Sequence, residues 1–362
     1  MNRNTELLEG NSNLNRVCYY VSYDPPPNKL NATLCTHIIA GFSSVKNGVV
    51  DVGGNGKLYT DTTALKKQYP HLKVLMTVGG GGNDQGFSLV VSSPANRLKF
   101  IASAFSTMKK YGFDGLDIDW EFPAWNNHHP EDRNNFIQFL KEFNAYAQFI
   151  GLEFMKVQPL LTVAVAAPKI IVDKSYDIPE MAKYVDFINL MTYDFNDYFW
   201  YTPYVAHNSP LFNRSVEKAY FAKLNTAWSS NYWNQLGMPK SKIMVGIPTY
   251  GHTYKLLDPK LNYVGAPATA GGADVTFTEA CQFLASGATR VFDSESQVPY
   301  AFKDYDWISY EDKESILRKA KWIKSQGFGG AMTFDLNCDD YSLICDEASF
   351  PLHRILYDVF TS

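Results

Sequence analysis

Short runs of Val, Ile, Leu, Met and Tyr alternate with longer amphipathic segments along this chain of 362 residues. Such runs are typical of buried strands, whereas apolar residues at helical spacing predict helices. Strands are expected at 16–20, 37–42, 73–78, 115–119, 160–166, 187–191, 242–248 and 329–334. Helices are expected at 61–68, 94–111, 130–149, 178–184, 215–233 and 310–326. Strands that alternate with helices in this way predict an α/β fold, a parallel (β/α)8 TIM barrel with its catalytic groups at the C-terminal strand ends.

The alternation is interrupted between the seventh and eighth expected strands, where 253–307 is too long for one helix. This segment holds a Gly- and Ala-rich stretch at 265–272, a short helix candidate at 278–285 and β-like pieces at 290–292 and 298–302. We expect a small α+β insertion on top of the barrel that walls one side of a cleft. The expected division is a flexible N-terminal segment at 1–15, a catalytic barrel at 16–252 and 308–362, and the insertion at 253–307.

The composition argues against two classes of binding partner. The formal net charge is -4 and no long run of Lys or Arg occurs, which argues against nucleic acid as a partner. No apolar run approaches the length of a membrane span, so no membrane partner is expected either. The 23 Tyr, 24 Phe and 7 Trp residues suit both core packing and the stacking of sugar-like ligands. We expect a monomer.

The N-terminal residues 1–15 are polar and lack the hydrophobic core of a signal peptide. Two alternatives follow: the protein is intracellular, or its signal has been removed. Five cysteines and the two sequons at Asn31 and Asn213 favour the secretory route and make these asparagines glycosylation candidates. We therefore expect a secreted protein whose signal peptide is not part of this sequence. The odd number of cysteines leaves at least one thiol free or intermolecular.

The most unusual stretch lies at 113–123, where Asp114, Asp117, Asp119 and Glu121 stand among large apolar residues. In a strand the last three share one face, roughly 6 to 7 Å apart, while the apolar residues between them take the other. Three negative charges at this spacing repel one another, so at least one group should hold a proton near neutral pH. A protonated carboxyl beside an ionised one is the arrangement that protonates a leaving group.

Other expected strand ends carry groups suited to the same site. The sixth strand is followed by Tyr193 and Asp194, and the seventh by Tyr250. A tyrosine hydroxyl and an aspartate from another strand could orient a substrate carbonyl and support the acid. The third strand ends in glycines, including Gly80, which allow a ligand or the backbone to approach closely.

The pattern Asp114-x-x-Asp117-x-Asp119-x-Glu121 resembles the signature of glycoside hydrolase family 18, the chitinases and chitinase-like proteins. Further matches follow in order along nearly the whole chain: Cys18-Tyr19-Tyr20, Cys35-Thr36-His37, Val78-Gly79-Gly80, Met191-x-Tyr193-Asp194-Phe195, His207-Asn208-Ser209-Pro210-Leu211, Gly246-x-Pro248-Thr249-Tyr250-Gly251, Val264-Gly265-Ala266-Pro267-Ala268 and Gly329-Gly330-Ala331-Met332. The resemblance implies hydrolysis of β-1,4 bonds between N-acetylglucosamine units of chitin or chitooligosaccharides, by an endo-type enzyme that needs no metal or cofactor.

The resemblance also implies a substrate-assisted mechanism, an exception to the usual pair of catalytic carboxylates. Glu121 would protonate the glycosidic oxygen while the substrate's acetamido oxygen attacks the anomeric carbon and forms an oxazolinium ion. Asp119 would orient the acetamido group, turning between Asp117 and Glu121, and Asp117 would share a proton with it. Tyr193 would donate a hydrogen bond to the acetamido carbonyl. Water would then open the ring with Glu121 as base, which gives retention.

By the same resemblance, the sugar-binding residues are Asp194, Met191, Tyr19, Phe42, Gly80, Trp200, Tyr250, His252, Met332 and Phe334. The resemblance pairs Cys18 with Cys35, and a second disulfide is expected between Cys338 and Cys345, with Cys281 left as the odd thiol.

Departures from the family pattern concern the sugar-binding surface. Gly81 and Phe334 stand where family members commonly have Trp, Tyr23 where Trp is frequent, and His252 where Arg often occurs. Weaker stacking is the expected result. A second hypothesis is therefore a chitooligosaccharide-binding lectin with weak or no hydrolysis, and a third is a barrel for another N-acetyl sugar. The intact acid at Glu121 favours the enzyme. Phe199, Trp125 and Trp307 are further candidates for stacking a sugar.

Overall fold

The computed structural model describes residues 14–151 and 158–362, and eight parallel strands in it close into a barrel. They are β1 (Asn15–Tyr20), β2 (His37–Lys46), β4 (Lys73–Gly79), β5 (Gly115–Asp119), β6 (Leu160–Ala166), β7 (Phe187–Met191), β8 (Ile243–Pro248) and β14 (Gly330–Phe334). Strand β1 pairs with both β2 and β14, which closes the ring, and β3 (Val49–Asp51) adds to β2 in antiparallel. The predicted barrel is confirmed. Of the expected N-terminal segment, 1–13 lies outside the described residues, and Asn15 already belongs to β1.

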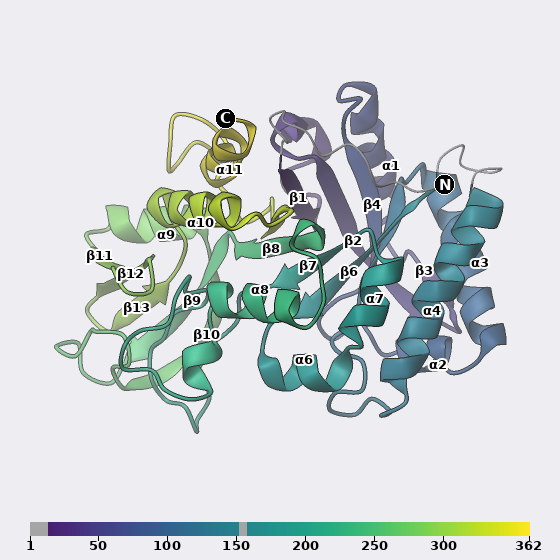
Figure 1. Ribbon diagram of the computed structural model, residues 1–362. Helices are drawn as coiled ribbons and strands as arrows, with labels where there is room; N and C mark the ends of the chain where they lie inside the picture. Colours follow the sequence, from purple (N-terminus) through teal and green to yellow (C-terminus); the bar gives the residue numbers. More distant parts are fainter. Residues whose placement is uncertain (1–13, 152–157) are drawn as a thin grey trace.

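Helices cover the outside of the barrel (Figure 1). They are α1 (Gly56–Ala64), α2 (Phe87–Val91), α3 (Pro94–Tyr111), α4 (Asp132–Tyr146), α6 (Lys169–Ser175), α7 (Ile178–Tyr184), α8 (Thr226–Gln235), α10 (Lys313–Gln326) and α11 (Pro351–Thr361). Helices α3 and α7 have the predicted bounds. The expected helices at 61–68 and 215–233 are displaced, because α1 starts at Gly56 and α8 starts only at Thr226.

Local sequence explains where the long helices begin and end. The Ser93 side chain accepts a hydrogen bond from the backbone of Asn96, Pro94 opens α3, and Gly112 ends it with φ 77°. In the same way the Asp312 carboxylate caps the first turn of α10, and Gly327 ends that helix with φ 72°. These caps satisfy backbone groups that a helix leaves unpaired at its ends.

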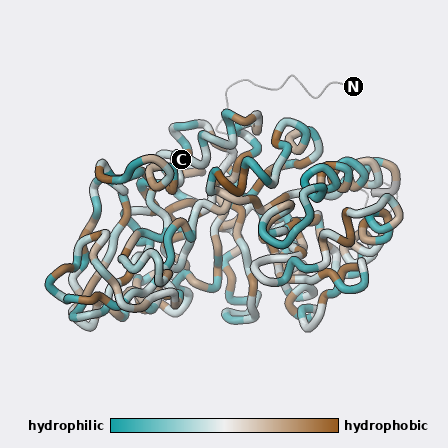
Figure 2. Tube along the Cα trace, turned by 90° about the horizontal axis from the view of Figure 1, so that it is seen from below, coloured by the Kyte–Doolittle hydropathy of each residue, from teal (hydrophilic) through white to brown (hydrophobic). Residues whose placement is uncertain are grey.

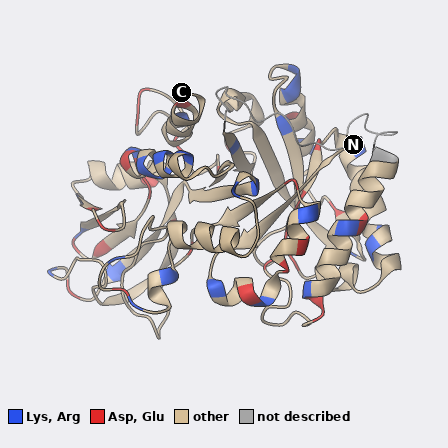
Figure 3. Ribbon diagram, in the orientation of Figure 1, with Lys and Arg blue, Asp and Glu red and all other residues tan. Residues whose placement is uncertain are grey.

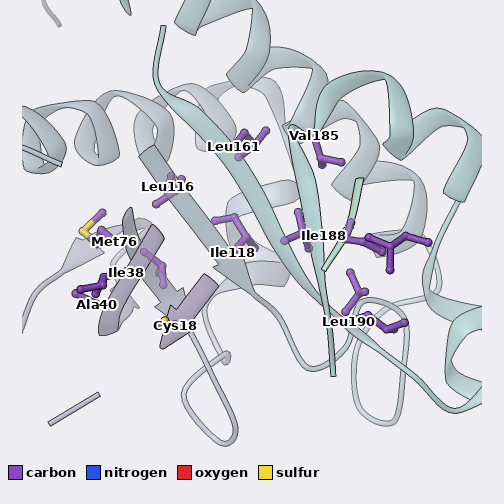
Figure 4. Close-up of a cluster of buried hydrophobic side chains, with 14 of the residues drawn as sticks. Cys18, Ile38, Ala40, Met76, Leu116, Ile118, Leu161, Val185, Ile188 and Leu190 are labelled. Atoms are coloured by element: carbon purple, nitrogen blue, oxygen red, sulfur yellow. The ribbon is translucent and has the colours of Figure 1, made fainter. Parts of the chain in front are cut away.

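Side chains of the barrel strands alternate between two hydrophobic clusters. Leu116 and Ile118 of β5 point outward and pack in the cluster beneath the helices, as Figure 4 shows. Tyr19 of β1 and Met332 of β14 belong instead to a second cluster inside the barrel. Along the outer helices hydrophobic and hydrophilic residues alternate (Figure 2). The outward-facing cluster holds the fold, and the inward-facing side chains are available to form a site.

A five-stranded antiparallel sheet lies beside the barrel, on the left in Figure 1. Its strands are β9 (Tyr250–Leu256), β10 (Ala268–Thr276), β11 (Thr289–Asp293), β12 (Val298–Lys303) and β13 (Asp306–Ser309), with α9 (Phe277–Ala285) after β10. The expected α+β content is present, but residues 268–272 of the Gly- and Ala-rich stretch at 265–272 belong to β10. Trp307 is fully buried against Tyr254 and Tyr300 in this sheet. It is therefore a core residue and the prediction that it could stack a sugar is wrong.

Two disulfides are present, and one of them corrects the sequence analysis. Cys18 and Cys35 are bonded as expected. The predicted pair of Cys338 and Cys345 is wrong: Cys345 is bonded to Cys281, and Cys338 is the free thiol. The reason is spatial, since α9 brings Cys281 to a Cα–Cα distance of 5.6 Å from Cys345, within the range that a disulfide spans.

The surface carries charges of both signs. Lys and Arg are interspersed with Asp and Glu over the outer helices in Figure 3. Within 14–151 and 158–362, no helix has the length and apolar character that crossing a membrane requires. Both sequons lie among the described residues, with Asn213 exposed and Asn31 half-buried.

Candidate active site

Strand β5 delivers the acidic residues to the C-terminal mouth of the barrel. Asp117 and Asp119 are buried inside the barrel, at 0% and 3% exposure, while Leu116 and Ile118 face the helices. Glu121 follows two residues after the strand ends at Asp119 and is partly exposed. The alternation predicted from the sequence is therefore observed.

Asp117 is the fixed member of the acidic series. Its Oδ2 accepts a hydrogen bond from Tyr19 Oη at 2.7 Å, and its Oδ1 accepts bonds from Thr162 Oγ1 at 2.5 Å and Asn189 Nδ2 at 3.1 Å. Burial raises the pKa of Asp117, and the hydrogen bonds from Thr162 and Tyr19 act against this rise. These donors from three other strands hold the carboxyl in one position.

Asp119 is buried but incompletely bonded. Among the residues that the structure describes, no donor reaches its Oδ1. Burial raises the pKa of Asp119 well above its usual value, and the charges of Glu121 and Asp117 raise it further. A buried polar atom without a partner is costly, so this oxygen indicates a position where a ligand supplies the missing bond.

Glu121 has the protonation behaviour of a general acid. Burial, followed by the charges of Asp84 and Asp194, raises the pKa of Glu121 from 4.5 to about 7. A carboxyl of this kind keeps much of its proton at neutral pH and can deliver it to a leaving group.

The end of β7 and the start of β9 place Tyr193, Asp194, Tyr250 and His252 side by side. Asp194 Oδ1 accepts hydrogen bonds from Tyr250 Oη at 2.6 Å and from His252 Nε2 at 3.0 Å. Tyr193 Oη donates to Met332 Sδ at 3.8 Å, and a thioether is a weak acceptor, so this hydroxyl is available to a ligand.

Asn208 is a residue of this site that the sequence analysis assigned no role. Its Oδ1 accepts from the backbone N–H of Asp194 at 2.7 Å, and its Nδ2 donates to the carbonyl of Tyr250 at 3.3 Å. Asp194 has φ 52°, a left-handed conformation that few residues other than glycine adopt, and the hydrogen bonds of Asn208 hold it there. The signal for Asn208 was its place in the matched stretch His207-Asn208-Ser209-Pro210-Leu211.

His252 has an acceptor at each ring nitrogen. The Asn196 carbonyl lies 3.0 Å from Nδ1, and the Asp194 carboxylate lies at the same distance from Nε2. Burial would lower the pKa of His252, but the hydrogen bond with Asp194 and the charge of that carboxylate outweigh it, so the pKa is raised. The histidine thus joins the five-stranded sheet to the loop after β7.

An aromatic floor lies between these polar groups. Phe334 contacts Tyr19, Phe42, Tyr193 and Tyr250, with ring centroids 5.5 to 6.4 Å apart. Met191 packs against the same interior cluster. A Cβ at Gly80 would lie 2.7 Å from the Phe42 ring, so this position requires glycine.

The rim of the mouth is open in two places. A hollow of about 490 Å³ is lined by Asp194, Phe195, Asp197, Phe199, Tyr250, His252, Asp274, Phe334 and Cys338. Trp200, which follows the lining residue Phe199 in the sequence, is 82% exposed. On the other side, a Cβ at Gly81 would be 3.6 Å from Glu121 Oε1, so no side chain separates this loop from the acid. The Nζ of Lys174 lies 5.3 Å from the ring centroid of Trp125, which is half-buried.

The structure thus brings together every predicted catalytic residue and most of the predicted binding residues. In the described part of the chain, no group of three or more His, Cys, Asp or Glu residues is arranged to hold a metal ion.

The family model for glycosyl hydrolases family 18 matches residues 15–339. The chain belongs to glycoside hydrolase family 18. Chitotriosidase-1 of Mus musculus is 36% identical over 97% of this chain and 79% of its own length. Chitinase-3-like protein 2 of Homo sapiens is 33% identical over 96% of this chain and 92% of its own length. This family 18 chain therefore has relatives named as chitinases and as chitinase-like proteins.

Solved family 18 structures give the same two kinds of neighbour. An immunomodulatory active chitinase from Trichuris suis matches with a TM-score of 0.90 and 33% identity, over 96% of this chain and 99% of that one. Human YKL-39, described as a pseudo-chitinase with retained chitooligosaccharide binding, matches with a TM-score of 0.90 and 32% identity, over 96% and 100%.

Proposed function

We propose that this protein is a chitinase, which hydrolyses β-1,4 bonds between N-acetylglucosamine units with retention. The observation that carries the proposal is the buried Asp119 Oδ1, which has no partner among the described residues and stands between the fixed Asp117 and the protonatable Glu121. An acetamido N–H is the donor that this oxygen lacks. When the acetamido N–H donates to Asp119 Oδ1, the acetamido oxygen is held for attack on the anomeric carbon.

In this proposal Glu121 protonates the glycosidic oxygen and later accepts a proton from the attacking water. The substrate's own acetamido oxygen is the nucleophile, so the chain supplies none. Tyr193 Oη donates to the acetamido oxygen, and Asp119 stabilises the positive charge of the oxazolinium ring. Asp117, held by Tyr19, Thr162 and Asn189, can share a proton with Asp119.

The remaining predicted residues form the proposed sugar-binding surface. Met191, Phe42, Met332 and Phe334 form an apolar floor, with Tyr19 and Gly80 beside it. Asp194, Tyr250 and His252 present polar groups, and Trp200 offers an exposed ring to a sugar on the leaving-group side. We retain the division into a catalytic barrel at 16–252 and 308–362 and an insertion at 253–307. The place of Asp274 of β10 in the lining of the hollow supports a cleft wall there.

We also propose that the protein acts outside the cell as a monomer. Two disulfides favour an oxidising compartment, where such bonds persist. Chitin or chitooligosaccharides are then its proposed partners.

A second candidate function is a chitooligosaccharide-binding protein with weak or no hydrolysis. The specific observation in its favour is the small aromatic area of the floor, where Phe334 and the bare Gly81 leave little surface for stacking. Human YKL-39, described as a pseudo-chitinase with retained chitooligosaccharide binding, has the same fold.

Hydrolysis of fluorogenic chitobiose and chitotriose glycosides by the wild type and Glu121→Gln separates the two functions. We expect fluorophore release by the wild type and a loss of at least about 100-fold in the variant, because proton transfer by a positioned acid contributes about that much. Calorimetric titration with chitin oligomers is the parallel measurement. Binding without release by the wild type would reject the chitinase and support the lectin.

A further inference from the structure

A cluster of polar side chains, none of them a specified residue of the family signature, lies beside the acid. It consists of Asp84 in the loop after β4, Ser88 of α2, Trp120 after β5, His128 in the loop before α4, and Asp132 of α4. The sequence analysis assigned no function to any of them. Because Trp120 directly precedes Glu121, the cluster includes the residue next to the acid.

The hydrogen bonds in the cluster determine which nitrogen of His128 carries a proton. Trp120 Nε1 can only donate, and it lies 3.3 Å from His128 Nδ1. Ser88 Oγ also lies 3.3 Å from this nitrogen, but its proton goes to Asp132 Oδ2 at 2.6 Å. Nδ1 is therefore the acceptor, and Nε2–H donates to Asp84 Oδ2 at 3.1 Å.

This chain of bonds links the Asp84 carboxylate, through His128, to Trp120, the residue that precedes the acid. Asp84 is 7% exposed, and its loop lies against the end of β5, since Gly80 N donates to the Asp119 carbonyl at 2.8 Å. The same loop approaches Glu121 at Gly81, where a Cβ would be 3.6 Å from Oε1.

We propose that Asp84, held by His128 and Trp120, is a positioning residue for Glu121. The negative charge of Asp84 keeps the Glu121 carboxyl protonated at neutral pH. This inference rests on the proposed function of Glu121 as general acid. It agrees with the pKa of Glu121, which burial raises most, followed by the charge of Asp84 and then by the charge of Asp194. Among the described residues, the titratable groups that interact electrostatically with Glu121 include Asp84, Asp119, Asp194, Tyr176 and Tyr193.

The variant Asp84→Asn tests the charge with little change of shape, because its amide oxygen can still accept from His128 Nε2–H. We expect the alkaline limb of the kcat/KM profile for a fluorogenic chitobioside to move down by about 0.5 to 1 pH unit. The kcat at acid pH, where Glu121 is protonated in both proteins, should change less than about twofold. Asp84→Glu, which keeps the charge, should retain most of the wild-type profile. Asp84→Ser is a second neutral variant that serves if the asparagine variant does not fold.

Asp132→Asn is the matched control. It removes a carboxylate that Asp84 reaches only through His128 and Ser88, so it should lower the melting temperature and leave the alkaline limb in place. A structural role for the whole cluster would make Asp84→Asn behave like this control. An unmoved alkaline limb in a folded neutral variant overturns the proposal.

A readout without turnover separates this inference from the proposed function. Carboxyl ¹³C NMR of glutamate-labelled protein, with Glu121→Gln to assign the signal, follows the titration of Glu121 directly. A lower midpoint in Asp84→Asn supports the inference even if the wild type hydrolyses nothing, in which case only the proposed function fails. An equal midpoint in both proteins rejects the inference even if the enzyme is active.

Discussion

Glu121 is a residue whose function and stability oppose each other. Its pKa is raised by burial from 4.5 to about 7, so the folded state holds a proton that the unfolded chain releases above pH 4.5. The folded state therefore loses stability as the pH rises from 4.5 through 7, by about 3 kcal/mol for a rise of this size. We predict that Glu121→Gln, which cannot ionise, melts at a higher temperature than the wild type at pH 8 and at a similar temperature at pH 4.5.

Calorimetric scans at both pH values provide the measurement for Glu121. Asp114→Asn is not a suitable control, because Asp114 is bonded to Lys66 and the backbone of Val74 and has a structural role of its own. Glu347 is a more suitable control, because its side chain is exposed and Glu347→Gln removes a carboxylate from the surface alone. Equal melting of wild type and Glu121→Gln at pH 8 would contradict the raised pKa.

Asp117 and Asp119 should respond differently to the same substitution. Asp117 accepts from Tyr19, Thr162 and Asn189, so Asp117→Asn turns an N–H₂ group toward donors and leaves buried groups unsatisfied, at a cost of about 1–3 kcal/mol. Asp119 has an unpartnered oxygen in the described structure, so Asp119→Asn should lower turnover strongly without lowering the melting temperature. Chitobioside hydrolysis and thermal melts of both variants check this contrast. Unaltered turnover in Asp119→Asn would reject its role in substrate assistance.

At the level of single residues, the sequence analysis could place groups that share a strand but not groups that meet through loops. The period of two in β5 was enough to put Asp117 and Asp119 on one face. Asp84 and His128 lie 44 positions apart in two irregular loops, and no periodic pattern relates them. Their contact depends on how the loops after β4 and β5 fold over the barrel mouth.

Among the elements, the buried barrel strands were predicted well, whereas the exposed strand β10 was not. Strands β5, β6 and β7 have the predicted bounds, because continuous apolar runs mark strands that are covered on both faces. Strand β10 is exposed along most of its length and contains Gly271 and Gly272, so it lacks any apolar alternation. Its pairing with β9 supplies the stability that its sequence does not signal.

The disulfide that the sequence analysis mispaired joins α9 to the loop before α11. Cys281 and Cys345 close a loop of 64 residues, for which the chain-entropy model gives about 4 kcal/mol, against about 3 kcal/mol for the 17 residues between Cys18 and Cys35. We predict that replacing both Cys281 and Cys345 by Ser lowers the melting temperature more than replacing Cys18 and Cys35 does. Cys338→Ser should have the smallest effect.

Thiol counting tests the same pairing by a different route. The unfolded, unreduced protein should react with one equivalent of a thiol reagent, and peptide mass spectrometry should locate the label on Cys338. Label on Cys281 together with a peptide that links Cys338 to Cys345 would restore the pairing expected from the sequence and refute the structural assignment.

At the scale of the whole molecule, the candidate site is shared between two sheets. The barrel contributes the acidic series and Asp194, while the five-stranded sheet contributes His252 and Asp274. The bond between His252 and Asp194 couples the two, so a change in one sheet reaches the polar half of the site. The alternation of strands and helices predicted this arrangement only in outline, because no periodic pattern relates His252 to Asp194.

The proposed secretory route, together with the folded structure, predicts which sequon carries a glycan. An oligosaccharide is attached at an Asn-x-Ser/Thr sequon that a surface loop presents. Asn213 is exposed between β7 and α8, whereas Asn31 is half-buried at the start of a 3-10 helix between the bonded Cys18 and Cys35. When the chain is produced through a eukaryotic secretory pathway, we predict a glycan on Asn213, detected by glycosidase treatment and peptide mass spectrometry.

Asn213→Gln should abolish the mobility shift caused by the glycosidase, and Asn31→Gln should preserve it. A secreted, active protein without any glycan would count against the sequon assignment, and full occupancy of Asn31 alone would show that burial does not govern the choice between the two sites.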